Sequence, residues 1–196
     1  MPQFDLRGIK CAKYVNTAGV ITYESLQSVG DAMNVNIELR FAEGRLYAES
    51  SLAEYIRKCT GGTISIGVKY IKNGAQILMF GLTGVERTVT LPNSTEVSVN
   101  SLKTQRNTVG NYVGISFYAP DQIDGQEKYT AVFVSRCMFG QPAMSLQTAG
   151  ENIQFNTPTT SGEFLSDGSE GGAIIEVAIC DTEAIAKAWC DAVMAS

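Results

Sequence analysis

Histidine is absent from this chain of 196 residues. Because imidazole is the commonest general base and a frequent metal ligand, its absence excludes the serine and cysteine triads built on it and most zinc and non-haem iron sites. The cysteines are odd in number and widely spaced, and they include no C-x-x-C pair. We therefore expect reduced thiols in the core rather than a disulfide framework or a metal knuckle. These cysteines are Cys11, Cys59, Cys137, Cys180 and Cys190.

Charge and long apolar runs are also scarce. Charged residues make up 18% of the chain and hydrophobic residues 44%, a composition too apolar for a disordered protein. No apolar run approaches the ~20 residues of a membrane span, so we expect a globular protein without membrane insertion. A net charge of -5 gives no basic surface for gripping phosphates. The start of the chain lacks a signal-peptide pattern, which favours a reducing cytosol, and the length predicts a single domain over residues 1–196.

Alternation of apolar and polar residues predicts most of the strands. Residues 33–41 alternate throughout, residues 42–44 resemble a turn, and residues 45–49 alternate again, which predicts a hairpin. A third strand at 63–68 is expected in the same sheet. Further strands are predicted at 112–118, 129–139, 144–148, 152–156 and 173–179, with 129–139 central because it is apolar on both faces.

Two helices and two irregular segments complete the prediction. Helical spacing over 71–80, followed by Gly81, indicates a short helix. Residues 82–109 are polar and predict a long loop or ribbon, and 166–172 form a Gly- and Ser-rich loop that we expect to be flexible. Asp181 or Thr182 can cap a C-terminal helix over 181–195, whose buried face is predicted to carry Ile185, Trp189 and Val193.

These elements predict a mainly β fold. We expect two packed antiparallel sheets, as a sandwich or a partly closed barrel, with one short helix and a C-terminal helix.

No group of residues indicates catalysis, and no cofactor or metal is expected. Asp121, Asp124 and Glu127 miss the spacing of a calcium loop and suit a hairpin turn better. Glycine pairs such as Gly61-Gly62 lack the strand, helix and lysine of a phosphate cradle. Cys137 has no imidazole to activate it and is expected to be a small buried hydrophobe.

The outward strand positions are unusually rich in neutral polar side chains. Such a surface offers hydration and little fixed positive charge, so it would suit a wall past which a polyanion slides; an ordinary solvated sheet face is the alternative. These side chains are Asn34, Asn36, Ser145, Gln147, Asn152, Gln154 and Asn156.

Several segments, in this order, resemble the major tail protein (tail tube protein) family of long-tailed bacteriophages (siphophages). The match is carried by GIKCAKY at 8–14, GRLYAE at 44–49, GTISIGV at 62–68, YVGISFY at 112–118, DG at 124–125 with KYTAV at 128–132, QT at 147–148, IQFNTP at 153–158 and GEF at 162–164. Residues 82–109 and 167–196 depart from the family pattern.

The resemblance implies a structural protein of the virion tail, assembled in the host bacterial cytoplasm, rather than an enzyme. It implies two antiparallel sheets packed at a steep angle, hexameric rings stacked into a hollow tube, and a lumen barrel through which DNA is ejected into the host. The implied partners are further copies of the chain, a tape-measure protein and tail-tip and terminator proteins, with transient passage of double-stranded DNA.

Within that reading, two sets of residues are predicted to have roles. The lumen-facing candidates are Asn34, Asn36, Glu38, Gln147, Gln154 and Asn156, and the inter-ring contact candidates are Phe4, Leu6, Val97, Val99 and Lys103. Two alternatives remain open: the tube of a tailocin or related injection machine, and a monomeric β-sandwich module that binds carbohydrate. The latter requires exposed aromatic platforms, whereas Tyr112, Phe117, Tyr118, Tyr129 and Phe133 are expected to be mostly buried or cross-strand.

Overall fold

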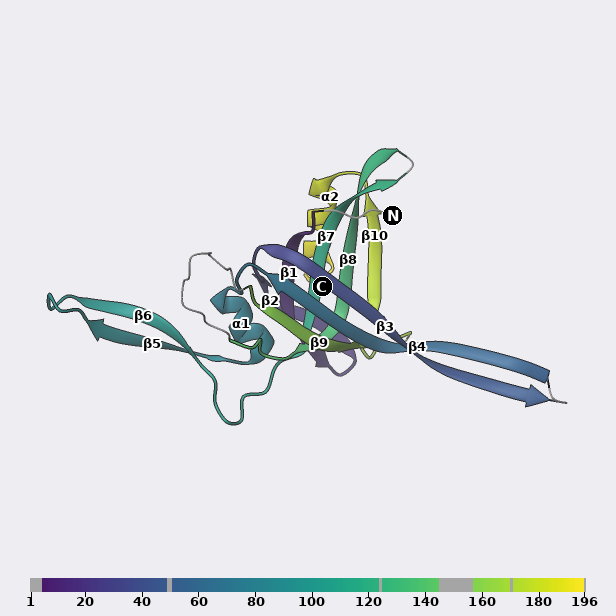
Figure 1. Cartoon of the computed structure of the whole chain (residues 1–196), viewed down its shortest axis with the longest axis horizontal. Coiled ribbons are helices and arrows are strands. Elements are labelled where there is room, and N and C mark those ends of the chain that lie inside the picture. Colours follow the sequence, from purple (N-terminus) through teal and green to yellow (C-terminus); the bar gives the residue numbers. More distant parts are fainter. Residues whose placement is uncertain (1–4, 49–50, 124, 145–156, 170, 196) are drawn as a thin grey trace, which may run out of the picture.

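The computed structural model describes residues 5–48, 51–123, 125–144, 157–169 and 171–195, which form ten strands and two helices (Figure 1). Every strand pair is antiparallel, so the predicted mainly β fold with one short helix and a C-terminal helix is confirmed. The elements are β1 (Arg7–Thr17), β2 (Val20–Ser28), β3 (Ala32–Ala48), β4 (Ser51–Val68), α1 (Asn73–Phe80), β5 (Thr83–Thr90), β6 (Glu96–Lys103), β7 (Val113–Ile123), β8 (Gln126–Phe139), β9 (Thr159–Leu165), β10 (Ile175–Cys180) and α2 (Glu183–Ala192).

One hydrogen-bonded sheet of eight strands folds over itself to make two layers. Its order is β2-β1-β7-β8-β9-β4-β3, and β10 pairs with the middle of β8, over residues 129–134. Strands β9, β4 and β3 cross the layer formed by β1, β7, β8 and β10 at a steep angle in Figure 1. Strand β8 joins the layers because it pairs with β7 along one edge over residues 126–137, and along its other edge with β10 over residues 129–134 and with β9 over residues 136–139. The prediction that this segment is central is confirmed.

The main core lies between the two layers and is closed by α1. Strand β7 is buried on both faces, and its odd-numbered residues Val113, Ile115 and Phe117 enter this core. Ile64, Ile66 and Val68 of β4 meet them from the other layer, and Ala75, Leu78, Met79 and Phe80 of α1 are buried in the same cluster. Helix α1 ends at Gly81, which adopts the left-handed conformation (φ 66°) that its position predicted.

Helix α2 packs on the opposite face of β7 and β8 and forms a third layer. Thr182, one of the two predicted caps, accepts a hydrogen bond from the Ile185 backbone N–H. The predicted buried face is wrong at Ile185, whose side chain is 51% exposed, whereas Trp189 is half-buried. The large rings of Tyr118 and Phe133 occupy the sheet face beneath α2, so the helix approaches through small residues. The buried helix residues are Ala186 and Cys190, followed by Met194 just beyond the helix.

The hairpin predicted over residues 33–49 needs correction. Residues 42–44 do not form a turn: β3 runs unbroken from Ala32 to Ala48, so residues 45–48 continue the first strand, and Gly44 pairs with Ile56 of β4. The strand that returns is β4, and the strand predicted at 63–68 in the same sheet is its far end. The pair β1–β2, which was not predicted, lies at one side of the sheet and brings Ile9 and Cys11 into the core.

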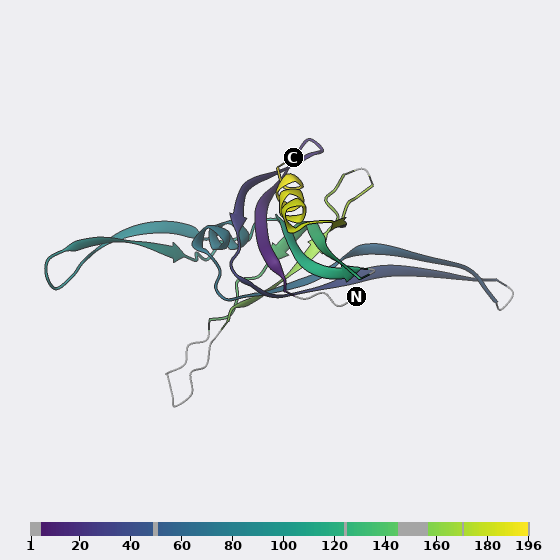
Figure 2. The same cartoon turned by 90° about the horizontal axis from the view of Figure 1, so that it is seen from above.

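Two hairpins project from the body on opposite sides, as Figures 1 and 2 both show. The β3–β4 arm comprises residues 41–48 and 51–60, beyond a bulge at Thr60. The β5–β6 arm comprises residues 83–90 and 96–103 and forms a separate two-stranded sheet. The segment 82–109, predicted to be a loop or ribbon, is therefore a ribbon over most of its length. In the predicted hairpin of residues 144–156, only Met144 lies within the described residues, and the loop at 166–172 contains no strand among its described residues.

Candidate functional site

A continuous polar face covers the outer side of β3, β4 and β9. The strand register places three rows of polar or small residues next to one another, two of them uncharged and the third with a glutamate at each end. These rows are Asn34, Gly67 and Thr159; Asn36, Ser65 and Ser161; and Glu38, Thr63 and Glu163. The Ser161 hydroxyl donates to the Ser65 hydroxyl at 3.3 Å, and the Asn36 amide donates to Glu38 at 3.2 Å.

Glycine residues allow the strands of this polar face to approach closely. Gly67 lies on the face itself, where a Cβ would lie 2.4 Å from the amide oxygen of Asn34, and Gly62 lies on the core-facing side of β4 beside Phe164, where a Cβ would lie 2.0 Å from the carbonyl oxygen of Glu38. Side chains at these two positions would displace the neighbouring strand or its amide. The face is therefore built from short side chains at its centre and amides along one edge.

Half of the lumen-facing candidates lie on this polar face. Asn34, Asn36 and Glu38 are all exposed there, on the side of β3 opposite Val35 and Ile37, which pack against the core. The face also carries charge, because Arg40 donates to Glu163 at 3.2 Å. The remaining candidates, Gln147, Gln154 and Asn156, lie outside the described residues.

The β5–β6 arm is amphipathic, and two of the inter-ring candidates lie on its apolar face. Val89 pairs with Val97, and Arg87 pairs with Val99, so these side chains share one face of the ribbon. The three valines are 41–46% exposed, which is high for β-branched side chains on a strand. The opposite face carries Glu86, Thr88, Glu96, Ser98 and Asn100.

The other inter-ring candidates lie elsewhere. Lys103 is exposed at the base of the β5–β6 arm, opposite Thr83. Leu6 is half-buried and packs against the main core, so its side chain is largely occupied within the subunit. Phe4 lies outside the described residues.

The β3–β4 arm carries a ladder of charged and aromatic side chains that was not predicted from the sequence. Glu43 lies 3.5 Å from both Arg45 and Arg57, the Arg57 guanidinium stacks 3.9 Å from the centre of the Phe41 ring, and Arg45 lies 5.6 Å from that of Tyr55. The turn wrongly placed at residues 42–44 concealed this ladder, because it separates residues that the unbroken strand holds on one face. The opposite face exposes Leu46 and Ile56.

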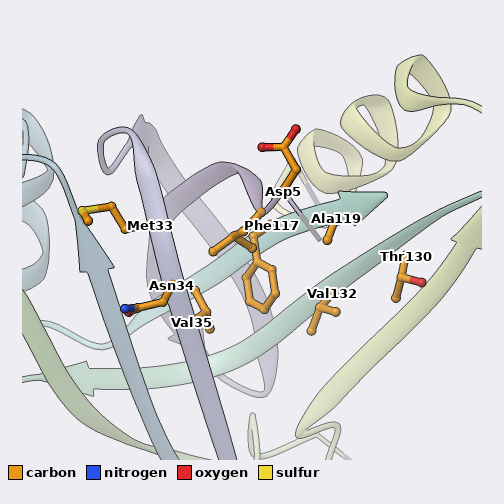
Figure 3. Close-up of a pocket in the computed structure, with 9 residues that line it drawn as sticks. Asp5, Met33, Asn34, Val35, Phe117, Ala119, Thr130 and Val132 are labelled. Atoms are coloured by element: carbon orange, nitrogen blue, oxygen red, sulfur yellow. The ribbon is translucent and has the colours of Figure 1, made fainter. Parts of the chain in front are cut away.

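A shallow open cavity of about 280 Å³ lies beside the start of β3 (Figure 3). Phe117 and Val132 form its apolar floor, and Asp5, whose carboxylate pairs with Arg7, lies at its rim. Thr130 lines the cavity, and its hydroxyl donates at 3.2 Å to Oδ2 of Asp121, a buried carboxylate whose Oδ1 has no hydrogen-bond partner among the described residues.

The four buried cysteine thiols, those of Cys11, Cys137, Cys180 and Cys190, are not activated. Burial raises the pKa of Cys11 to about 12, that of Cys190 to about 11, and that of Cys137 well above its ordinary value. Buried thiols with raised pKa values are poor nucleophiles and poor metal ligands. Among the residues with described positions, no group of three or more Cys, Asp and Glu side chains could hold a metal ion.

Neither described helix has the length and apolar character needed to cross a bilayer.

The prediction that certain aromatic rings are buried or cross-strand is confirmed for Phe117, Tyr118 and Phe133, which are buried, and for Tyr129, which is half-buried and lies opposite Pro120 and Cys180; Tyr112 is half-buried. No protein-family model and no curated protein matches this chain.

Proposed function

We propose that this protein is the structural subunit of a bacteriophage tail tube, assembling into hexameric rings that stack around a lumen through which DNA passes. The observation that carries the proposal is the pair of arms on opposite sides of the body, each with exposed apolar side chains. Isolated two-stranded hairpins are marginally stable in water, and exposed apolar faces favour association. Both features are expected of a subunit that completes its fold by assembly.

The polar face supports the role proposed for the lumen. Its central positions are glycine, serine and threonine, its edge carries amides, and its one guanidinium is paired with Glu163. A phosphate backbone passing along such a surface meets few cations that could bind it, because phosphate affinity comes mainly from lysine and arginine. In the proposed tube, this face lines the lumen through Asn34, Asn36 and Glu38.

The free edge of β3 supports assembly in a closed ring. Among the described residues, this strand of 17 residues pairs only with β4. A long unpaired edge invites uncontrolled pairing, and closure of a ring covers such edges. The proposed partners beyond further copies are a tape-measure protein and tail-tip and terminator proteins.

Negative-stain electron microscopy of the purified protein at increasing concentration tests this proposal. We expect rings, and hollow tubes of uniform diameter at higher concentration. Substituting Ser65 and Ser161 with lysine should leave the tubes intact but make them retain added double-stranded DNA, because the polar face would then carry cations. Irregular aggregates or isolated particles at every concentration would contradict the tube. Tubes that retain no DNA after these substitutions would contradict the lumen assignment alone.

A further inference from the structure

We infer that the β5–β6 arm of one copy joins edge to edge with the β3–β4 arm of a second copy, forming a four-stranded ribbon between subunits. The inference rests on the proposed function, because both require the chain to associate with itself. It goes further in assigning the partner of each arm and the side chains that recognise it.

The two arms are equal in length and point away from the body in opposite directions. Each contains eight cross-strand pairs, from Phe41 to Ala48 in one and from Thr83 to Thr90 in the other. Because the arms leave the body on opposite sides, one arm of a copy can reach the other arm of the next copy in line (Figure 2). Such a head-to-tail contact repeats from copy to copy and generates a ring if the rotation closes.

The first pair of matching faces is complementary in charge. On the β3–β4 arm, Arg45 and Arg57 share the single carboxylate of Glu43, so this ladder has one uncompensated positive charge. On the β5–β6 arm, the polar face carries Glu86 and Glu96, neither of which has an ion pair among the described residues. Neighbouring strands that present opposite charges on one face stabilise each other, whereas like charges repel.

The second pair of faces is apolar and completes the match. When two ribbons join edge to edge with the charged faces on the same side, the opposite faces also become continuous. Leu46 and Ile56, 58% and 54% exposed, then adjoin the valine face of the β5–β6 arm. Glu54 lies on this face of the β3–β4 arm and Arg87 on the valine face of the β5–β6 arm, and their charges are opposite. Neither residue has an ion pair within the described part of the chain, and Lys58 lies nearer the base of the β3–β4 arm.

Charge reversal tests the pairing because the predicted contact joins two different surfaces. One variant carries Arg45→Glu and Arg57→Glu, and a second carries Glu86→Arg and Glu96→Arg. In each variant alone, every arm-to-arm contact brings like charges together. In an equimolar mixture, alternating copies restore opposite charges at both kinds of contact. A variant with all four substitutions restores them within one chain, and Lys187→Glu on α2 controls for charge reversal at an exposed site away from the arms.

The readout is the protein concentration at which half of the chains are assembled, measured by light scattering. We expect each reversal variant to need at least about a tenfold higher concentration than the unsubstituted protein, and the mixture and the fourfold variant to recover. Damage to the arm itself would not be repaired by mixing, so recovery separates pairing from misfolding. If the unsubstituted protein assembles and the reversal variants assemble equally well, or the mixture fails to recover, arm pairing is wrong while the tube proposal stands. If the unsubstituted protein never assembles, the proposed function itself is wrong.

Discussion

Removal of the β5–β6 arm should abolish assembly without unfolding the subunit. Gly84 of β5 and Leu102 of β6 are directly opposite each other, so residues 85–101 can be replaced by the two-residue turn Asn-Gly. This variant keeps Leu102, which packs against the core, and removes only residues that are exposed or half-buried.

The expected effect on stability is small because no buried contact is lost. The Ser101 hydroxyl, for example, donates to the Val85 carbonyl within the arm itself. Changes confined to such surface positions alter the free energy of unfolding by less than about 1 kcal/mol. For a chain of this size, that corresponds to a change in Tm of less than about 4 °C.

The assay combines thermal unfolding, followed by circular dichroism, with light scattering. The arm-deleted protein should unfold near the temperature of the intact protein and should scatter as a monomer at concentrations where the intact protein assembles. A matched variant with the arm retained, in which Val89, Val97 and Val99 are changed to threonine, should be monomeric at the same concentrations. Unchanged assembly of the deleted protein would refute the role given to the arm. A fall in Tm of more than about 8 °C would refute its independence from the core.

Three other predictions concern the body of the subunit. Phe164 of β9 is fully buried, so Phe164→Ala should lower the free energy of unfolding by about 3–5 kcal/mol in denaturant titrations, whereas Leu165→Ala, at the exposed neighbour, should cost less than about 1 kcal/mol. Hydrogen bonds from Arg7 and then Tyr118 lower the pKa of Glu183 below its ordinary value of 4.5, so the ionised carboxylate stabilises the fold above pH 4.5 and loses this effect as the pH falls through the lowered pKa. The difference in free energy of unfolding between the unsubstituted protein and Glu183→Gln should therefore shrink on acidification. A difference that does not change with pH would contradict this. Cys59 is half-buried and the other cysteines are buried, so a thiol reagent should modify one thiol rapidly in the native protein, and Cys59→Ser should abolish that fast phase.

Local signals were sufficient to predict several elements. The left-handed glycine at 81 ended α1 as expected, Thr182, one of the two predicted caps, capped α2, and the strands predicted at 112–118 and 129–139 located the β7–β8 pair. In each case the determining interaction lies within a few residues of the signal, so the sequence contains it directly.

Features that depend on distant partners were not predictable in the same way. Ala-Glu-Gly at 42–44 resembles a turn, but the cross-strand contacts of Glu43 with Arg57 and of Gly44 with Ile56 keep the strand straight. Ile185 was expected in the core, but the rings of Tyr118 and Phe133 select the smaller helix residues for the contact. The polar character of Asn34, Asn36 and Glu38 was evident, whereas their rows with β4 and β9 depend on the register of the folded sheet.

The central claim is that this chain builds a closed assembly of its own copies, and its mass in solution tests that claim most directly. Light scattering coupled to size-exclusion chromatography over a concentration series measures this mass. The account predicts a species of six times the 21.1 kDa of one chain, followed by larger stacks as the concentration rises. A mass of one chain up to the highest soluble concentration would contradict it.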